Sequence, residues 1–387
     1  MLNEQQISSA VEKFTALLRE QSARSDEISA QGGFTDYAGL EKLVIGVCGG
    51  DGIGPTITAV SAKVLESMLA PEIAAGKVEI RNIDGLTIEN RIACMKPIPD
   101  DVMAQLKACH VILKGPTTTP QAGDGRPNLE SANVAMRKAL DLFANVRPVK
   151  IPEEGIDWTF FRENTEGAYA VGSKGLNADD DLAVDFVVTT TEGTRRIARL
   201  AYDYARRNGK SRVSIISKAN VIKTTDGKFL RLCREIGEDY PEITTDEWYI
   251  DILTAKLVDP ARRKDFQVVV LPNLYGDIVT DEAAQLQGGV GTAGSANIGK
   301  KYAMFEAIHG SAPRMVEEGR AQYADPCSML RATAMLLDHV GFTDRAKKLD
   351  AALDACTAPG ARMKITGRPD GCTCAEFADY VIETLGE

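Results

Sequence analysis

Residues 266–285 read FQVVVLPNLYGDIVTDEAAQ, a short apolar run followed by a segment with two aspartates four residues apart. The apolar run is typical of a buried strand. A helix that begins near Asp277 would place Asp277 and Asp281 side by side on one face, where like charges repel unless positive charge lies nearby. Either both acids decorate the first helical turn, where the helix dipole favours negative charge, or they bind Mg²⁺ or Mn²⁺, which prefer oxygen ligands.

Short apolar runs alternate with helical patterns from residue 42 onward. The runs are KLVIGVCG (42–49), KVEIRNIDG (77–85), CHVILKG (109–115), WTFFREN (158–164), RVSIISK (212–218) and FQVVVLP (266–272). Amphipathic segments such as 198–207 and 229–239 lie between several of them. This alternation predicts an α/β architecture with substantial parallel sheet. Residues 183–191, which are β-branched after an acidic stretch, are a further expected strand and a candidate dimer or clasp element.

The bulk composition excludes several classes of protein. A length of 387 residues favours two domains, and 44 % hydrophobic with 26 % charged residues is typical of a globular protein. The formal net charge of -10 disfavours partners such as nucleic acid or anionic membrane, so an anionic ligand must meet a local cluster of arginines. The eight cysteines are scattered, which favours reduced, mostly buried thiols over disulfides or a zinc site.

The N-terminal region predicts an added helix ahead of the main fold. Its stripe of apolar residues consists of Ile7, Ala10, Val11, Phe14, Leu17 and Leu18. The helix could pack on its own subunit or serve as an arm in an oligomer. Glu4, Glu12 and Glu20 argue against a targeting segment, and no apolar run approaches the ~18 residues of a membrane span. We therefore expect a cytoplasmic protein.

The loop VIGVCGGDGIGP (44–55) invites a dinucleotide-binding interpretation that its spacing does not support. Gly50, Gly52 and Gly54 follow a strand, but G-x-G-x-G-P is not the G-x-G-x-x-G fingerprint of a Rossmann fold. Pro55 suits the first position of a following helix. The nucleotide site is therefore expected elsewhere.

Three arginines stand at the ends of expected elements. Ser131 can cap a helix that carries Arg137, Arg147 follows that helix, and Arg162 ends a strand with Tyr169 close behind. Each arginine alone is compatible with a surface salt bridge. Together they could bind several carboxylates, which guanidinium groups grip with two parallel hydrogen bonds.

Eight motifs in order resemble those of the metal-dependent β-decarboxylating dehydrogenases, the isocitrate and 3-isopropylmalate dehydrogenase family. They are GGDGIGP (49–55), LKGPTTTP (113–120), SANVAMR (131–137), FANVRP (143–148), RENTEGAY (162–169), SKANV (217–221), NLYGDIVTD (273–281) and HGSAP (309–313). The resemblance implies the two-domain fold of that family, with mixed, largely parallel sheets and no Rossmann fold. It implies an N-terminal extension at 1–40, a large domain at 41–142 and 286–387, and a small domain with dimer contacts at 143–285.

The resemblance also implies a homodimer or higher homo-oligomer that shares active sites. Substrate carboxylates would meet Arg137, Arg147 and Arg162. Asp277 and Asp281 would bind Mg²⁺ or Mn²⁺ together with Asp251 of the partner subunit, and the metal would acidify the substrate hydroxyl. Three further residues would complete the reaction. They are Lys218, lent by the partner to take up the hydroxyl proton, Tyr169, which protonates carbon after CO₂ leaves, and Asn220, beside the nicotinamide.

The coenzyme expected from the resemblance is NAD or NADP, and the choice stays open. Its adenosine end would lie at the turn His309, Gly310, Ser311, Ala312 and Pro313. NAD-using relatives place an acid after this turn and NADP-using relatives place Lys-Tyr, whereas this chain has Arg314 and Met315. Asp325 stands where relatives usually have asparagine against the adenine.

The substrate favoured by the sequence is isocitrate. Ser131 and Asn133 are polar, whereas isopropylmalate enzymes surround the isopropyl group of their substrate with leucines. If these two side chains faced an isopropyl group, their buried polar atoms would have no hydrogen-bond partner, at a cost of about 1–3 kcal/mol. Homoisocitrate is the nearest alternative substrate. Glu130 favours isopropylmalate instead, because an acid directly before Ser131 resembles the pattern of the isopropylmalate enzymes. A regulatory, non-catalytic subunit of a hetero-oligomeric dehydrogenase is a second class of hypothesis. A nucleotide-binding module without chemistry is a third, but it leaves the paired aspartates unexplained.

Overall fold

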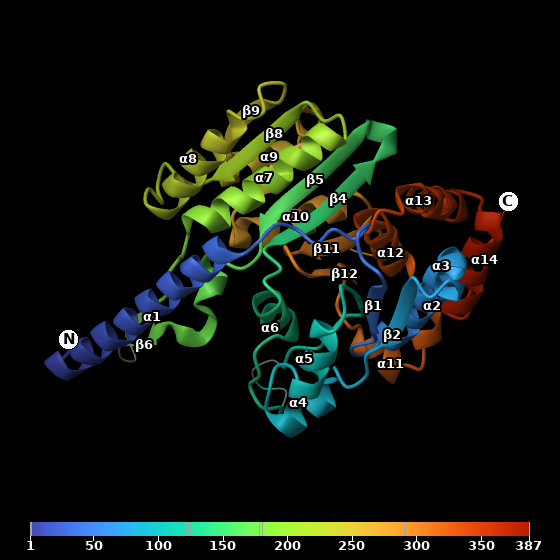
Figure 1. Cartoon of the computed structure of the whole chain (residues 1–387), viewed down its shortest axis with the longest axis horizontal. Helices are drawn as coiled ribbons and strands as arrows, with labels where there is room; N and C mark the ends of the chain where they lie inside the picture. Colours follow the sequence, from blue (N-terminus) through green and yellow to red (C-terminus); the bar gives the residue numbers. More distant parts are fainter. Residues whose placement is uncertain are drawn as a thin grey trace. The chain divides into compact units, whose positions relative to one another are not determined.

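The structure is a computed structural model that describes residues 2–120, 123, 125–177, 179, 181–289 and 291–386. The chain divides into two compact units and passes between them after residues 33, 142 and 286. We call residues 2–33 with 143–286 unit 1, and residues 34–142 with 287–386 unit 2. Each unit contains its own set of strands and helices (Figure 1).

Unit 1 contains the N-terminal helix and the middle of the chain. Its helices and strands are α1 (Glu4–Ala30), β4 (Ala144–Ile151), η1 (Pro152–Glu154), β5 (Ile156–Glu163), η2 (Ala168–Ala170), η3 (Gly172–Lys174), β6 (Leu176–Asn177), β7 (Ala183–Val184), α7 (Thr191–Arg207), β8 (Arg212–Ser217), α8 (Thr225–Gly237), β9 (Thr244–Tyr249), α9 (Ile250–Val258), η4 (Arg263–Asp265), β10 (Val268–Leu271) and α10 (Asn273–Leu286).

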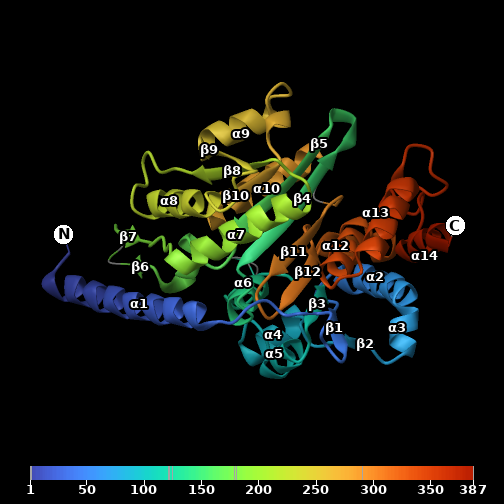
Figure 2. The same ribbon diagram turned by 45° about the horizontal axis from the view of Figure 1, so that its top comes forward.

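The main strands of unit 1 lie in the order β4-β5-β10-β8-β9. β4 and β5 are antiparallel, whereas the other neighbours are parallel. Successive side chains of β5 point to opposite faces: Phe160 packs in the core with α9 and α10, and Phe161 contacts Tyr204 of α7 at a ring distance of 5.2 Å. Figure 2 shows α9 and α10 on one side of these strands and α7 on the other.

Unit 2 contains the glycine loop and the C-terminal part of the chain. Its helices and strands are β1 (Leu43–Cys48), α2 (Gly54–Met68), α3 (Ala70–Ala74), β2 (Val78–Asn82), α4 (Ile88–Cys94), α5 (Asp100–Lys107), β3 (Val111–Lys114), α6 (Ala132–Ala139), β11 (Gly294–Ile298), β12 (Ala303–Ala307), α11 (Pro313–Glu317), η5 (Ala321–Tyr323), α12 (Cys327–His339), α13 (Thr343–Thr357) and α14 (Cys374–Gly386).

The strands of unit 2 lie in the order β2-β1-β3-β12-β11. All neighbours are parallel except β11 and β12. One face is covered by α5 and α6, whose Leu106 and Met136 belong to a core that includes Ile112 and Met304. On the other face Phe305 contacts His339 of α12. The predicted α/β architecture with mixed, largely parallel sheet is confirmed.

The glycine loop of unit 2 is shaped by close contact with neighbouring backbone. Gly50 and Gly52 have φ of +70° and +61°, and a Cβ at Gly52 would lie 1.9 Å from the carbonyl oxygen of Ser311. The Asp51 carboxylate accepts hydrogen bonds from the backbone N–H groups of Ile88 and Thr118, both at 2.7 Å. The glycines therefore allow tight loop packing, and Pro55 lies in the first turn of α2 as expected.

The predicted N-terminal helix exists, but its apolar stripe is divided between two environments. Leu17 is buried against unit 1, whereas Ile7, Val11 and Leu18 are exposed. Phe14 stacks on Phe186 with ring centroids 4.9 Å apart. Part of the helix therefore packs on its own chain, next to α7.

The strand expected at 183–191 is much shorter, and in this respect the prediction was wrong. β7 covers only Ala183–Val184, and Val188 forms an isolated bridge with Gly167. Thr190 is instead the N-cap of α7, because its hydroxyl accepts a hydrogen bond from the backbone N–H of Gly193 at 3.1 Å.

All eight cysteines are free, and six of them are buried, as the sequence analysis expects. Among the described residues, no helix combines the length and the apolar character needed to cross a membrane.

Candidate active site

Two arginines of unit 1 face α10 because of the register between two strands. Arg147 of β4 is paired with Phe160 of β5, and paired residues of antiparallel strands share a face. Arg162 follows two positions later in β5 and therefore points the same way. Both guanidinium groups are buried, and both meet the helix that carries Asp277 and Asp281.

The arginines pair one to one with the two aspartates. Arg162 forms an ion pair with Asp277, and Nη1 of Arg147 lies 2.9 Å from Oδ1 of Asp281. The phenol of Tyr169 donates a hydrogen bond to the other oxygen of Asp277 at 2.6 Å. The Asp277 and Asp281 side chains keep 39 % and 64 % exposure, so they remain open to an incoming ligand. We call these five residues the arginine–aspartate cluster.

The cluster settles one of the two interpretations of the paired acids. α10 begins at Asn273, four residues before Asp277, so neither aspartate lies in the first helical turn. The interpretation of the acids as first-turn decoration is therefore wrong. The positive charge that separates them comes from Arg162 and Arg147, which are 115 and 134 residues away in the chain.

Three residues that the sequence analysis did not select hold the cluster in place. The side-chain oxygen of Asn273 accepts from Arg162 at 2.7 and 3.0 Å, and the Thr280 hydroxyl accepts from Arg147 at 2.6 Å. Gly276 lets the Arg162 side chain lie directly on helix α10, because a Cβ at residue 276 would be 2.4 Å from Cγ of Arg162. All three lie in the NLYGDIVTD motif, which was the available signal.

Lys218 and Asp251 form a second pair in unit 1. Nζ of Lys218 lies 2.5 Å from Oδ1 of Asp251, and this hydrogen bond lowers the pKa of Asp251. Asn220 lies in the exposed turn between β8 and α8. The backbone N–H of Lys218 donates to the buried carboxylate of Asp226 at 2.6 Å, which fixes the start of this turn.

The two aspartates of α10 are the acids expected to bind a metal ion in unit 1 together with Asp251 of the partner subunit. Across the described ranges, no group of three or more His, Cys, Asp or Glu side chains is placed to hold a metal ion. The two exposed carboxylates of α10 nevertheless fit a hard divalent cation, because they provide oxygen ligands four residues apart on one helix face.

One substrate residue expected in unit 2, Arg137, contacts a buried carboxylate. Nη2 of Arg137 lies 3.2 Å from Glu306, whose other oxygen lies 3.0 Å from Nζ of the fully buried Lys114. Burial alone would raise the pKa of Glu306, but Lys114 and then Arg137 lower it to about 2. This carboxylate therefore anchors Arg137. Neither Lys114 nor Glu306 was selected from the sequence. Lys114 lies in the LKGPTTTP motif, which was the available signal, whereas Glu306 lies in none of the eight motifs.

Ser131 and Asn133 take the expected positions at the start of α6. Ser131 is the N-cap residue, but its side chain makes no capping hydrogen bond, so that part of the prediction was wrong. The backbone φ of -58° and ψ of 128° at Ser131 give the N-cap turn without help from the hydroxyl. The Asn133 side-chain oxygen accepts a hydrogen bond from the Thr117 hydroxyl at 3.0 Å.

The predicted coenzyme turn is a constrained loop of unit 2. Ser311 is buried, its hydroxyl lies 2.8 Å from that of Thr118, and its carbonyl accepts from the backbone N–H of Ile53 at 3.0 Å. Ala312 has φ of +45°, which is uncommon for a residue with a side chain. Pro313 begins α11. His309 precedes this turn, with Nδ1 at 2.9 Å from the carbonyl oxygen of Gly310.

Two further residues of the expected coenzyme site have structural partners. The exposed Arg314 pairs with Glu318 one helical turn away at 2.7 Å. Asp325 accepts a hydrogen bond at 2.8 Å from the backbone N–H of Cys327, the first residue of α12.

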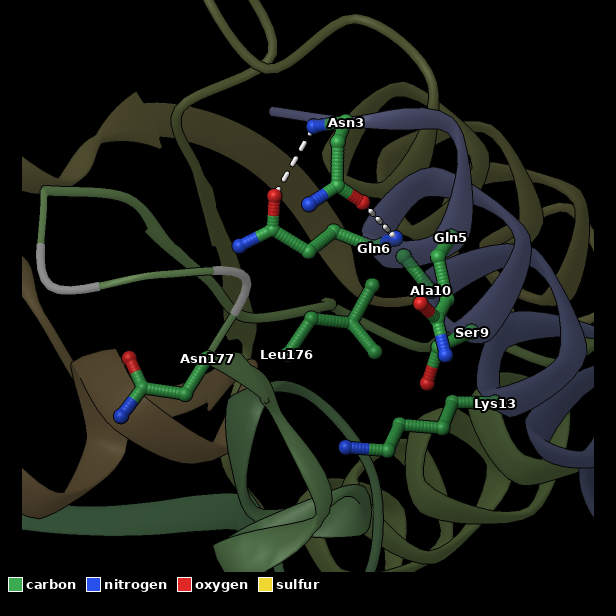
Figure 3. A pocket seen from close by; sticks show the side chains of 8 residues that line it. All are labelled: Asn3, Gln5, Gln6, Ser9, Ala10, Lys13, Leu176 and Asn177. Carbon is green, nitrogen blue, oxygen red and sulfur yellow. Dashed lines mark hydrogen bonds between the residues drawn. The ribbon is translucent and has the colours of Figure 1, made fainter. Parts of the chain in front are cut away.

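A polar hollow in unit 1 lies at the N-terminal end of α1 and carries no acid–base chemistry. Figure 3 shows the capping box in which Asn3 and Gln6 exchange hydrogen bonds at 2.8 and 2.9 Å. The lining residues are Asn3, Gln5, Gln6, Ser9, Ala10, Lys13, Leu176 and Asn177. Lys13 supplies the single charge of this lining, so the arginine–aspartate cluster remains the stronger candidate for chemistry.

Two buried arginines, two partly exposed aspartates and a tyrosine thus lie together in one unit of a mixed α/β fold. A family model described as isocitrate/isopropylmalate dehydrogenase matches residues 44–381, and the chain belongs to this family. The family resemblance drawn from the eight motifs is therefore confirmed.

Curated relatives and a solved structure agree with this assignment. The chain is 34 % identical over 350 residues to an isocitrate dehydrogenase [NADP] of Rickettsia prowazekii, which covers 87 % of this chain and 69 % of the relative. It is 35 % identical over 341 residues to the mitochondrial isocitrate dehydrogenase [NAD] subunit alpha of Macaca fascicularis, covering 86 % and 92 %. The crystal structure of isocitrate dehydrogenase from Methylococcus capsulatus matches with a TM-score of 0.76 and 34 % identity, covering 89 % of this chain and all of that one.

Proposed function

We propose that this chain catalyses the oxidative decarboxylation of isocitrate to 2-oxoglutarate, with NAD or NADP as hydride acceptor and Mg²⁺ or Mn²⁺ as the required cation. The observation that carries the proposal is the arginine–aspartate cluster, in which Arg147 and Arg162 alternate with Asp281 and Asp277 beside Tyr169. A regulatory subunit that had lost catalysis would have no reason to keep all five residues. The family membership and the relatives named isocitrate dehydrogenase support the same substrate class.

Each residue of the proposed active site has its own role in the reaction. When bound, the cation supplies Lewis-acid stabilisation of developing negative charge and the nicotinamide accepts the hydride. Arg147 and Arg162 bind substrate carboxylates, and Lys218 takes up the proton of the hydroxyl. Tyr169 donates its phenolic proton to carbon after CO₂ has left, and Asp277 orients that phenol before the reaction.

The charges of the cluster make substrate and cation depend on each other. A dicarboxylate alone would take Arg147 and Arg162 away from Asp281 and Asp277, and would leave two partly buried carboxylates without counter-charges. A cation bound by these aspartates replaces the lost positive charge. Binding of the two ligands together is therefore close to electrically neutral, and binding of either alone is penalised.

We further propose that the active unit is a homodimer, or a higher homo-oligomer, in which each site borrows Lys218 and Asp251 from the partner. This proposal is supported by the absence of a three-ligand metal group within the described part of one chain. Exposed apolar side chains around these residues are suited to a subunit contact, since contiguous patches of this kind mark interfaces. They are Val221, Ile222, Tyr249, Ile252, Leu274 and Ile278.

The function is tested by a matrix of initial rates. Isocitrate, homoisocitrate, 3-isopropylmalate, malate and tartrate are each assayed with NAD and with NADP, with added Mg²⁺ or Mn²⁺ and with a chelator. Isocitrate with one coenzyme should give the highest kcat/KM, and the chelator should abolish it. Asp277→Asn should remove most of the rate, whereas Asp239→Asn, an exposed aspartate after α8, should not. Equal turnover by Asp277→Asn and wild type would refute the metal assignment.

The shared site is tested by mixing two inactive variants. Asp251→Asn and Asp277→Asn should each be inactive alone, because each removes one ligand from every site. Refolded together in equal amounts, they should form mixed dimers with one intact site of two, and about a quarter of wild-type activity should return. No recovery, with dimers demonstrated by light scattering, would show that both aspartates act in one chain.

A further inference from the structure

The segment 163–169 of unit 1 connects two members of the arginine–aspartate cluster. It begins with Glu163, the last residue of β5, and reaches Tyr169 through a turn at Gly167, where φ is +70°. Gly167 exchanges two backbone hydrogen bonds with Val188, at 2.8 and 3.2 Å. A shift of this segment would move the phenol of Tyr169, which donates a hydrogen bond to Asp277 at 2.6 Å.

Two buried carboxylates hold the turn in its shape. Glu163 accepts hydrogen bonds from the backbone N–H groups of Thr165 and Glu166, at 2.9 and 2.6 Å, and burial together with the charge of Glu166 raises the pKa of Glu163 to about 7. Glu166 accepts from the backbone N–H of Thr190 at 2.9 Å, at the start of α7. A Cβ on Gly193 would lie 2.1 Å from the Glu166 carboxylate, so this carboxylate fits closely against the helix.

The N-terminal helix provides a cation for one of these acids, Glu166. Nη1 of Arg24 lies 3.3 Å from Oε1 of Glu166, and Nη2 donates to the Thr165 hydroxyl at 2.8 Å. Arg196 of α7 donates to the same hydroxyl at 3.2 Å. On α10, the Asn273 amide donates to the Glu166 carbonyl at 3.1 Å, and the oxygen of the same side chain binds Arg162. The segment is therefore held between α1 and α10.

We propose that Arg24 is a positioning residue of the active site, which acts through Glu166 and Thr165 to fix the segment that carries Tyr169. This gives the N-terminal helix a catalytic purpose, although it lies before the region matched by the family model, which begins at residue 44. The inference rests on the proposed function, because its readout is the rate of that reaction.

The expected effect follows from what Arg24 contacts. Its loss leaves the buried Glu166 carboxylate without an ion-pair partner from α1, and removes one donor from Thr165. A displacement of a catalytic group by about 1 Å can cost up to about 100-fold in rate. For Arg24→Gln we expect a fall in kcat of roughly tenfold. The KM for isocitrate should change less than about twofold, because Arg147 and Arg162 keep their own partners.

Four variants separate a positioning role from simple support of the helix. Arg24→Lys keeps the charge and should recover kcat to within about threefold of wild type. Arg19→Gln, an exposed arginine of the same helix, is the matched control and should behave as wild type. Glu166→Gln should reproduce the loss, and the double variant Arg24→Gln/Glu166→Gln should add little to it, since both changes break one interaction.

A second readout does not depend on turnover. Hydrogen exchange of the backbone amides in 163–169 should be faster in Arg24→Gln than in wild type and unchanged in Arg19→Gln. Unchanged kcat and unchanged exchange in Arg24→Gln, with an active wild type, would overturn the inference. An inactive wild type would instead overturn the proposed function, while the exchange result would still report on the contact.

Discussion

The substitution Gly276→Ala should disable the site by a displacement of Arg162. Gly276 lies in the first turns of α10, and a Cβ at this position would come 2.4 Å from Cγ and 2.6 Å from Cβ of Arg162. Carbon atoms in good contact are about 3.5–4.0 Å apart, so either the arginine or the helix must move by about 1 Å or more. The atoms that clash are close to the Arg162 backbone, so rotation of the side chain cannot relieve the overlap.

Gly276→Ala should change both the stability of the protein and the KM for isocitrate. Overpacking of a close contact costs about 1–3 kcal/mol of stability, and the better helix propensity of alanine offsets about 0.5–1 kcal/mol of it. A displaced Arg162 also loses a charge-assisted hydrogen bond to a substrate carboxylate, worth about 1.5–3 kcal/mol. Since about 1.4 kcal/mol is a tenfold change, the KM for isocitrate should rise roughly 10- to 100-fold.

The assay compares Gly276→Ala with Gly227→Ala. Gly227 is in α8 of the same unit and has no atom within 4 Å of an added Cβ, so its substitution should leave KM unchanged and raise the free energy of unfolding by about 0.5–1 kcal/mol. Steady-state kinetics and urea denaturation are measured on both variants. A Gly276→Ala enzyme with the wild-type KM would refute the argument that Arg162 needs the bare helix surface.

Three further predictions concern buried and exposed groups. Glu306→Gln should lower the free energy of unfolding by about 3–5 kcal/mol in urea denaturation, because it leaves the fully buried Lys114 without a counter-charge. Glu163 has a pKa of about 7 in the folded state, above its ordinary value of 4.5, so the folded protein keeps a proton that the unfolded chain releases between these pH values. Stability should therefore fall as pH rises from about 4.5 to about 7, and Glu163→Gln should weaken this pH dependence in urea denaturation; identical pH profiles of the variant and the wild type would contradict the buried acid. A thiol reagent should label the exposed Cys94 first and the half-buried Cys372 more slowly, and loss of the fast phase in Cys94→Ser checks the assignment.

The elements that the sequence predicts well are those specified by local pattern. Each of the six apolar runs overlaps an observed strand, because alternation of buried strands and amphipathic helices is visible within about ten residues. Strand β4 (Ala144–Ile151) was missed, since it begins inside the FANVRP motif and pairs with a neighbour through antiparallel register. The expected strand at 183–191 was wrong because its threonines also suit a helix cap, and only the position of α7 decides between the two.

The candidate site was predictable as a set of residues but not as an arrangement. The motifs named Arg147, Arg162, Tyr169, Asp277 and Asp281, and these residues do gather in unit 1. Their pairing depends on contacts across more than a hundred residues of chain, and single-sequence patterns carry no information about such distances.

The contact between the N-terminal helix and the segment before Tyr169 was hidden for the same reason. Arg24 and Glu166 are 142 residues apart. Nothing in the helix stripe marks this arginine, because an amphipathic pattern identifies apolar residues and gives polar positions no specific partner.

The group around Glu306 in unit 2 and the arginine–aspartate cluster in unit 1 differ in net charge. In unit 2, Arg137 and Lys114 share the single carboxylate of Glu306, so the group carries a net charge of +1. In unit 1, two arginines meet two aspartates, so the net charge is zero. The buried Glu306 cannot exchange its partners without a large desolvation cost, and it therefore serves as a fixed support that leaves Arg137 attractive to an anion. The aspartates of unit 1 are partly exposed and can exchange arginine for a cation.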